Sequence, residues 1–393
     1  MINSRYVTEI GYLSFNHVGE ELCGDHIEIT SPDECTKILV LADGLGSGVK
    51  ANILSTLTSK MLSSMIAGDI SIQECIKCIA NTLPVCKVRK VAYSTFSIIK
   101  IKDNRYVDIY NFDNPEPFVI HNGKVMDLIY ETTIIDNKNI HHTKYEASPY
   151  DTFFLMSDGV KYAGVGETLN FGWDMPQIKD FLGLIYRQEA SSKALATELA
   201  NRCNELYNFR PGDDTTVAVV RIRERKQVNV LIGPPTNKED DEMMLSLFFA
   251  KEGTHIVSGG TTGTIVARYL KKDVVLDSSG YLDKDVPPIA FIEGVDLVTE
   301  GIITITKVLE YANNYLDKNS EYMNWYYAQD GASLIAQQLF ENATDINFFV
   351  GCAMNNAHQG EETGINFTTK MHLIDDLADK LKTMGKNVRI SYF

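Results

Sequence analysis

The stretch Leu39–Gly48, which reads LVLADGLGSG, decides what the first part of this chain is. Its apolar residues are strong strand formers, and they lead directly into the Asp43-Gly44 pair. Glycine allows the backbone to turn sharply there and to present a carbonyl oxygen. A helical pattern follows over residues 47–67. The stretch therefore predicts a buried strand, an acidic loop at its end and then a helix.

Three more aspartates lie at the ends of predicted strands. They are Asp25 in Cys23–His26, Asp158 in Met156–Gly159 and Asp213 in Gly212–Thr216. A single Asp-Gly pair is typical of an ordinary turn, but four such acids spread over two hundred residues can converge at one sheet edge. Carboxylate oxygens are hard ligands that suit Mg²⁺ or Mn²⁺. Two such ions about 3.5–4 Å apart activate a shared water for attack on phosphorus.

Composition restricts the classes of function. The 393 residues favour two domains, and the formal net charge of −15 argues against binding nucleic acid through bulk electrostatics. No run of about 18 apolar residues is present, so we expect no membrane span. Seven cysteines without paired zinc motifs indicate reduced thiols in a cytoplasmic protein. Cys75 and Cys78 share one face of a helical pattern, which favours a structural role over a redox or metal-binding one.

The pattern of elements divides the chain into a domain of residues 1–224 and another of residues 226–393. The first contains many strand patterns and a hairpin at Asn122-Gly123. The charged run Arg221–Lys226 is interpreted as the linker. Beyond it, strands alternate with helices, which predicts an α/β domain with a mainly parallel sheet.

In order, these four aspartate motifs resemble those of the PPM (type 2C-like) metal-dependent serine/threonine phosphatases, and most of all the SpoIIE-like bacterial branch. The resemblance covers roughly residues 1–224. It implies an α+β fold, in which a PPM-type β-sandwich flanked by helices is followed here by the second α/β domain. It also implies hydrolysis of phosphoserine or phosphothreonine by a metal-bridging water, without a covalent intermediate.

Roles for individual residues follow from the same resemblance. Asp43 would bridge two Mn²⁺ or Mg²⁺ ions, and the Gly44 carbonyl would bind one of them. Asp158 and Asp213 would hold the other ion, and Asp25 would lie near the second ion, directly or through water. These four aspartates are thus the predicted catalytic and metal-binding residues.

Two departures from the eukaryotic members of the family concern the site itself. Gly24 stands where those members carry a glutamate metal ligand, and Leu45 stands where they carry a histidine suspected of protonating the leaving group. Both departures are usual in the SpoIIE-like branch. Asp214, next to Asp213, is open to two interpretations: a metal ligand or, with more weight, a structural hydrogen-bonding residue.

A second candidate site lies in the other domain. Gly259, Gly260, Thr261 and Thr262 follow a predicted strand and open a predicted helix, as an anion- or ligand-binding loop would. A tight turn in which threonine caps the helix is the alternative. Tyr322–Tyr327 contains four aromatic residues, which predicts packing rather than a partner surface.

The expected substrate is a phosphorylated protein in bacterial signalling, with no nucleic acid or membrane as partner. A homodimer is a further expectation from the family, although no heptad pattern is evident. Two alternatives stay open. One is a sensor or docking protein, with a ligand-binding C-terminal domain and a weak or conditional phosphatase domain. The other is a nuclease or phosphoesterase that uses the same two-metal chemistry, which the negative charge disfavours.

Overall fold

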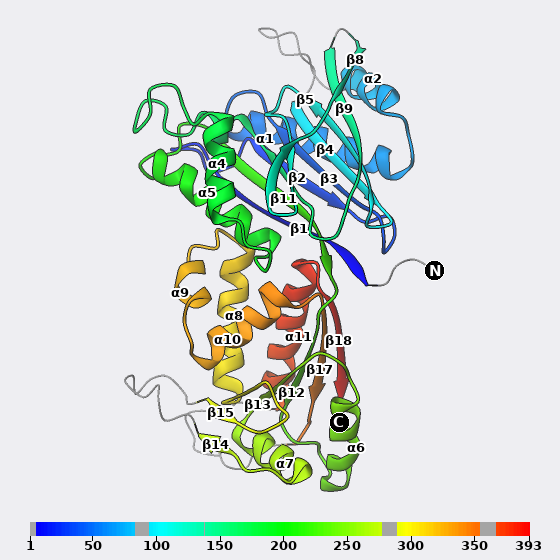
Figure 1. Cartoon of the computed structure of the whole chain (residues 1–393), viewed down its shortest axis with the longest axis vertical. Helices are drawn as coiled ribbons and strands as arrows, with labels where there is room; N and C mark the ends of the chain where they lie inside the picture. The colour runs from blue at the N-terminus through cyan, green and yellow to red at the C-terminus, as the bar shows by residue number, and fades with distance from the viewer. Residues whose placement is uncertain (1–4, 83–93, 137, 277–288, 354–366) are drawn as a thin grey trace. The chain divides into compact units, whose positions relative to one another are not determined.

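The computed structural model describes residues 5–82, 94–136, 138–276, 289–353 and 367–393. The chain divides into two compact units, Met1–Glu224 and Arg225–Phe393. Helices and sheets are mixed in both, which confirms the predicted α+β class (Figure 1). Within the described residues, no helix is long and apolar enough to cross a membrane.

The first unit contains two antiparallel sheets. The first sheet has the order β1-β11-β10-β6-β7 and the second has the order β2-β3-β4-β5-β9-β8. The strands of the first sheet are β1 (Tyr6–Phe15), β6 (Phe118–His121), β7 (Lys124–Asp127), β10 (Thr152–Met156) and β11 (Thr215–Glu224). Those of the second are β2 (Asp25–Thr30), β3 (Lys37–Asp43), β4 (Thr95–Lys102), β5 (Tyr106–Phe112), β8 (Glu131–Ile135) and β9 (Lys138–Glu146).

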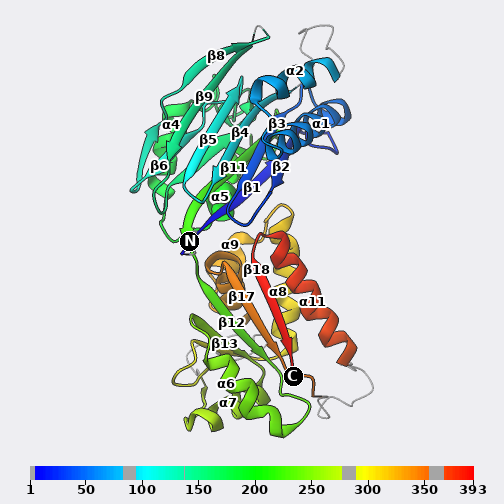
Figure 2. The same cartoon turned by 90° about the vertical axis from the view of Figure 1, so that its right-hand side faces the viewer.

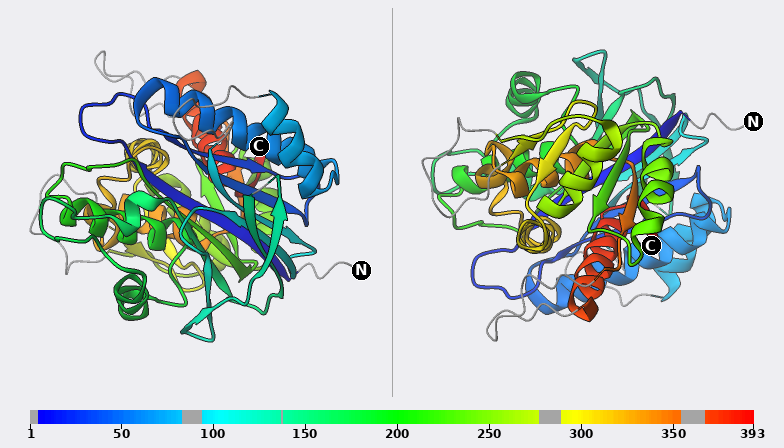
Figure 3. Two further views of the ribbon diagram at one scale, coloured as in Figure 1. Left: turned by 90° about the horizontal axis from the view of Figure 1, so that it is seen from above. Right: turned by 90° about the horizontal axis from the view of Figure 1, so that it is seen from below.

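Helices cover both outer sides of this sandwich (Figures 1 and 3). They are α1 (Gly48–Ala67), α2 (Ile72–Thr82), α3 (Asp158–Lys161), α4 (Met175–Ile185) and α5 (Ser192–Leu206). Strand β3 is buried on both faces, as its continuous apolar run predicts. Ile38 and Val40 pack under α1 and α2, whereas Leu39 and Leu41 join the core between the sheets. The fold of this unit thus fixes the strand that carries Asp43.

The charged run Arg221–Lys226 contains the boundary between the two units, as predicted, but most of it is not a linker. Strand β11 continues to Glu224 and the next strand begins at Gln227, so only Arg225 and Lys226 connect the two strands. Arg221 and Arg223 are buried, and Arg223 forms an ion pair of 2.6 Å with Glu9 of the neighbouring strand β1. These two charges therefore lie inside the sheet and do not mark a solvated segment.

The second unit is built around a largely parallel sheet, as predicted (Figure 2). Its strands are β12 (Gln227–Ile232), β13 (Thr254–Ser258), β14 (Val275–Leu276), β15 (Ala290–Phe291), β16 (Leu297–Thr299), β17 (Asp345–Val350) and β18 (Asn387–Tyr392). The parallel strands follow the order β16-β13-β12-β17-β18. From β12 the chain adds β13 and β16 on one side and then β17 and β18 on the other, so the strand order reverses between β12 and β17. Doubly wound folds bind ligands at such a point.

The helices of this unit pack in layers on its sheet. They are α6 (Asp241–Phe249), α7 (Gly260–Leu270), α8 (Ile302–Leu316), α9 (Tyr322–Tyr326), α10 (Gly331–Ala336) and α11 (Phe367–Thr383), with a 3₁₀ turn at Lys238–Asp240 and a π-helix at Gln337–Asn342. Residues 297–299 form β16, and α8 begins shortly after it at Ile302. Tyr322 and Trp325 are buried, which supports the packing interpretation of the aromatic run.

Candidate metal centre

Two of the predicted acids face each other across neighbouring strands. Asp25 begins β2 and is paired with Asp43, the last residue of β3, in the antiparallel register. The backbone N–H of Gly44 donates to the Gly24 carbonyl over 3.1 Å, which extends this pairing into the loop. Gly44 can be only glycine here, because a Cβ atom would lie 2.2 Å from the Ala51 carbonyl oxygen.

The other two acids come from the opposite sheet. Asp158 opens α3 two residues after the end of β10, and Asp213 lies two residues before Thr215, where β11 begins. Strands β10 and β11 are neighbours, and the N–H of Ser157 donates to the Thr216 carbonyl over 3.0 Å. The strand ends of both sheets therefore bring Asp158 and Asp213 to the acids of β2 and β3.

Electrostatic interactions show that the four side chains are neighbours. Burial raises the pKa of Asp43 to about 10, and the charges of Asp25, Asp158 and Asp213 contribute to that shift. Burial also raises the pKa of Asp25 well above its ordinary value, and that of Asp213 to about 6 with help from Asp158. Like charges held this closely disfavour ionisation unless a cation offsets them.

Asp25 is the most isolated of these acids. Its side chain is 4% exposed, and neither carboxylate oxygen has a hydrogen-bond partner of good geometry. The hydroxyls of Ser157 and Thr216 are near enough to lower its pKa in part, but burial outweighs them. A buried, unpartnered carboxylate is costly, so a cation ligand is the kind of partner it fits.

The donor set therefore suits a hard divalent cation, although its arrangement is not that of a finished site. Among the described residues, no three Asp, Glu, His or Cys side chains converge at ligand spacing. The acids nevertheless act on one another, because the charges of Asp25, Asp158 and Asp213 raise the pKa of Asp43. The roles of Asp25, Asp43, Gly44, Asp158 and Asp213 as ligands remain predictions.

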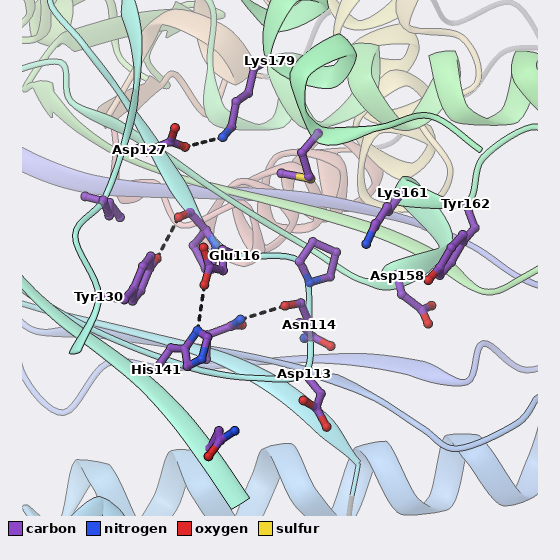
Figure 4. A pocket seen from close by; sticks show the side chains of 16 residues that line it. Asp113, Asn114, Glu116, Asp127, Tyr130, His141, Asp158, Lys161, Tyr162 and Lys179 are labelled. Carbon is purple, nitrogen blue, oxygen red and sulfur yellow. Dashed lines mark hydrogen bonds and ion pairs between the residues drawn. The ribbon is translucent and has the colours of Figure 1, made fainter. Parts of the chain in front are cut away.

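A cavity of about 510 Å³ opens beside Asp158 (Figure 4). Lys161 and Tyr162 line the same end, one turn beyond Asp158. The other basic side chains that line it contact acids: Lys179 is paired with Asp127, and Nδ1 of His141 lies 2.7 Å from Oε1 of Glu116. The remaining lining residues are Asn111, Asp113, Asn114, Pro115, Pro117, Leu128, Tyr130, Asn139 and Met175.

Sequence reasoning missed this cavity. The adjacent histidines at positions 141 and 142 lie in β9. There His142 stacks on Tyr110, with ring centroids 4.3 Å apart. Polar and apolar residues do not alternate over Lys138–Glu146, so the sequence carries no clear signal for this strand.

The other predicted features stand apart from this centre. Gly259 has φ +122°, and α7 begins at Gly260 without any side-chain cap, so the expected threonine cap is wrong. A ligand for the loop Gly259, Gly260, Thr261 and Thr262 remains a prediction. The shared apolar face of the two cysteines is also wrong, because Cys75 is buried but Cys78 is exposed.

Two antiparallel sheets covered by helices, with acids from both sheets meeting at one end, define the first unit as a PPM-type sandwich. The family model described as stage II sporulation protein E (SpoIIE) matches residues 33–223. Most of the first unit is therefore similar to the SpoIIE family. A comparison with curated proteins finds no match.

Several solved structures are similar to the chain. The PP2C phosphatase domain and a fragment of the regulatory domain of SpoIIE from Bacillus subtilis share 20% identity with it at a TM-score of 0.49. That match covers 56% of this chain and 65% of that one, so this chain spans less than two thirds of that structure. RsbX in complex with magnesium has 19% identity and a TM-score of 0.39, covering 56% and 96% of the two chains. The RsbU and RsbW domains of a Mycobacterium tuberculosis protein have 12% identity and a TM-score of 0.46, covering 85% and 80%.

Proposed function

We propose that the first unit is a Mn²⁺- or Mg²⁺-dependent protein phosphatase that hydrolyses phosphoserine or phosphothreonine in a bacterial signalling protein. One observation carries the proposal: acids at strand ends of both sheets raise one another's pKa, and the most buried of them, Asp25, has no hydrogen-bond partner of good geometry. The SpoIIE family match to residues 33–223 supports the same activity.

Five residues of the chain would hold two ions. The ligands would be the carboxylates of Asp25, Asp43, Asp158 and Asp213 and the carbonyl of Gly44. Such ions, when bound, lower the pKa of a shared water and offset the charge of the phosphate. Leu45 offers no acidic proton to the leaving group, so that proton would come from solvent.

The cavity beside Asp158 would receive the phosphorylated segment of the substrate (Figure 4). Lys161 contacts the Tyr162 ring, with its Nζ 5.6 Å from the centroid, and no acid forms an ion pair with it within the described residues. An ammonium group without an acidic partner is suited to contact a phosphate oxygen. Lys161 would therefore orient the substrate next to the acids.

The test compares Asp43→Asn with the wild-type full chain on a phosphoserine peptide, with Mn²⁺. The variant should lose nearly all turnover, because it removes a negative charge from the centre of the acid cluster. Asp103→Asn is the matched control, since Asp103 is exposed at φ +55°, a conformation that asparagine also adopts readily. Full metal-dependent activity in Asp43→Asn would disprove the assignment.

For the second unit, the proposal is a small-ligand binding module that regulates the first. The reversal of strand order between β12 and β17 supports it, because ligands bind at this point in doubly wound folds. If the module is regulatory, residues 1–224 alone should differ from the full chain in activity on the same peptide. Identical activity in the two proteins would argue against regulation.

A further inference from the structure

Asp214 is a buried acid that the proposed ligand set does not include. Its side chain is 3% exposed. The backbone N–H of His17 donates to its Oδ1 atom over 3.0 Å, but the Oδ2 atom is buried without a hydrogen-bond partner. One carboxylate oxygen thus has a structural hydrogen bond, while the other has none of good geometry; the Cys23 thiol is near enough for Asp214 to help raise its pKa.

The free oxygen occupies space that a side chain at position 24 would need. A Cβ atom built on Gly24 would lie 2.5 Å from Oδ2 of Asp214 and 3.0 Å from the Ala51 Cβ. Glycine at this position therefore leaves a hollow, and the Asp214 carboxylate fills it. Gly24, which leaves this hollow, directly precedes Asp25 in the chain. The Gly24 carbonyl also accepts the hydrogen bond of the Gly44 N–H, so the hollow lies beside the loop of Gly44.

Asp214 and Asp25 together form a pair of buried acids with three unpartnered oxygens. They interact electrostatically, since the charge of Asp214 raises the pKa of Asp25. As donors, only the hydroxyls of Ser157 and Thr216 act on Asp25, and the Oδ2 atom of Asp214 is buried without a hydrogen-bond partner of good geometry. Burying a carboxylate oxygen without a partner is costly. A divalent cation would offset both charges, whereas a purely structural role would need only the Oδ1 bond to His17.

We propose that Asp214 is a fifth acidic ligand of the metal centre and supplies, beside Asp25, the carboxylate that position 24 lacks. The ligand is a hard divalent cation, Mg²⁺ or Mn²⁺. This inference rests on the proposed metal-dependent function and assigns a residue to the side of the site where the sequence shows only glycine.

Asp214→Asn separates the two roles of this residue. An asparagine keeps an oxygen that accepts the His17 N–H, so a structural role is preserved, but it removes the charge. Without metal, the variant should unfold at the same temperature as the wild type, because the hydrogen bond from the His17 N–H is kept. With metal, it should bind Mn²⁺ about ten- to hundredfold more weakly in calorimetric titration, the range typical for lost support of a metal site.

A rescue experiment tests the position as well as the charge. Asp214→Ala empties the hollow and should weaken Mn²⁺ binding. The double variant Gly24→Glu with Asp214→Ala places a carboxylate in the same space from the other side, and should recover part of the affinity. Asp103→Asn, remote and exposed, should match the wild type in every titration.

The pattern of results distinguishes the two hypotheses. If the wild type binds Mn²⁺, Asp43→Asn loses it and Asp214→Asn binds as the wild type does, Asp214 is not a ligand and the proposed function stands. If the wild type itself binds no Mn²⁺, both ideas are wrong. Weakened binding together with an unchanged unfolding temperature of the metal-free Asp214→Asn protein supports the inference, whereas weakened binding with a lower unfolding temperature assigns a structural role.

Discussion

Gly159→Ala should damage the site through its geometry, without changing any charge. A Cβ atom at position 159 would lie 2.2 Å from the carbonyl oxygen of Asp214, whereas real Cβ contacts are essentially never under 3.0 Å. The two segments must therefore separate by about 0.8 Å, the difference between 3.0 and 2.2 Å. Gly159 cannot easily retreat, because its carbonyl accepts a 2.9 Å hydrogen bond from the buried Tyr207 hydroxyl.

The displacement separates Asp158 from Asp213, since the two clashing segments each carry one of these acids. Overpacking of this kind costs about 1–3 kcal/mol of stability. A misplacement of about 1 Å at a catalytic site costs on the order of a hundredfold in rate. We therefore expect a modest loss of stability together with a large loss of turnover.

The assay measures both quantities in a Trp325→Phe background. The chain has two tryptophans, so the buried Trp173 then reports urea unfolding of the first unit alone. Turnover is measured on the phosphoserine peptide with Mn²⁺. Gly183→Ala is the matched control, because a Cβ atom at this helical position meets nothing within 4 Å and alanine favours a helix. If Gly159→Ala behaved like Gly183→Ala, the close contact between the two segments would be refuted.

Three further results are expected. Lys161→Met should raise KM for the phosphopeptide about tenfold or more, as loss of a charge-assisted contact does. Lys179→Met, which makes the same charge change in the same cavity at a residue already paired, should have less effect; equal effects would point to general electrostatics. Glu9→Ala should lower the free energy of unfolding by about 3–5 kcal/mol, because it leaves the cation of a buried ion pair uncompensated; a change under about 1 kcal/mol in urea unfolding would contradict this. Iodoacetamide should label the exposed Cys78 in the native protein and spare Cys75, where burial raises the pKa to about 11 and keeps the thiol protonated; equal labelling in peptide mass spectra would show that the helix opens.

The sequence predicts the sheets of the first unit well where burial and periodicity agree. Strand β3 is an unbroken apolar run, and its ends fall within one residue of the expected Ile38–Ala42. Strand β11 is harder, because Arg221 and Arg223 resemble a solvated segment until their partners are known. Arginine pairing across a sheet depends on residues far apart in the chain, so local pattern cannot reveal it.

The candidate site shows the same limit. The order and spacing of the four aspartates identify the acids, because each follows or precedes a recognisable strand. The place of Asp214 depends on where Oδ2 lies relative to Gly24, and these residues are brought together only by the two sheets. The sequence likewise does not identify Lys161. A lysine three residues after Asp158 has no recognisable role until the structure shows that both residues line one cavity.

The metal centre also explains why its acids lie at the ends of strands and not in free loops. Three unpartnered carboxylate oxygens on Asp25 and Asp214 oppose folding, and flexible segments would move apart to relieve the repulsion. Here β2 is held by pairing with β3, and β11 is held between β1 and β10. The cores on either side of β3 supply the stability that this arrangement consumes. Substitutions that loosen these sheets are therefore expected to weaken cation binding before they unfold the unit. The acids repel one another, so they move apart as soon as the strands that hold them become mobile.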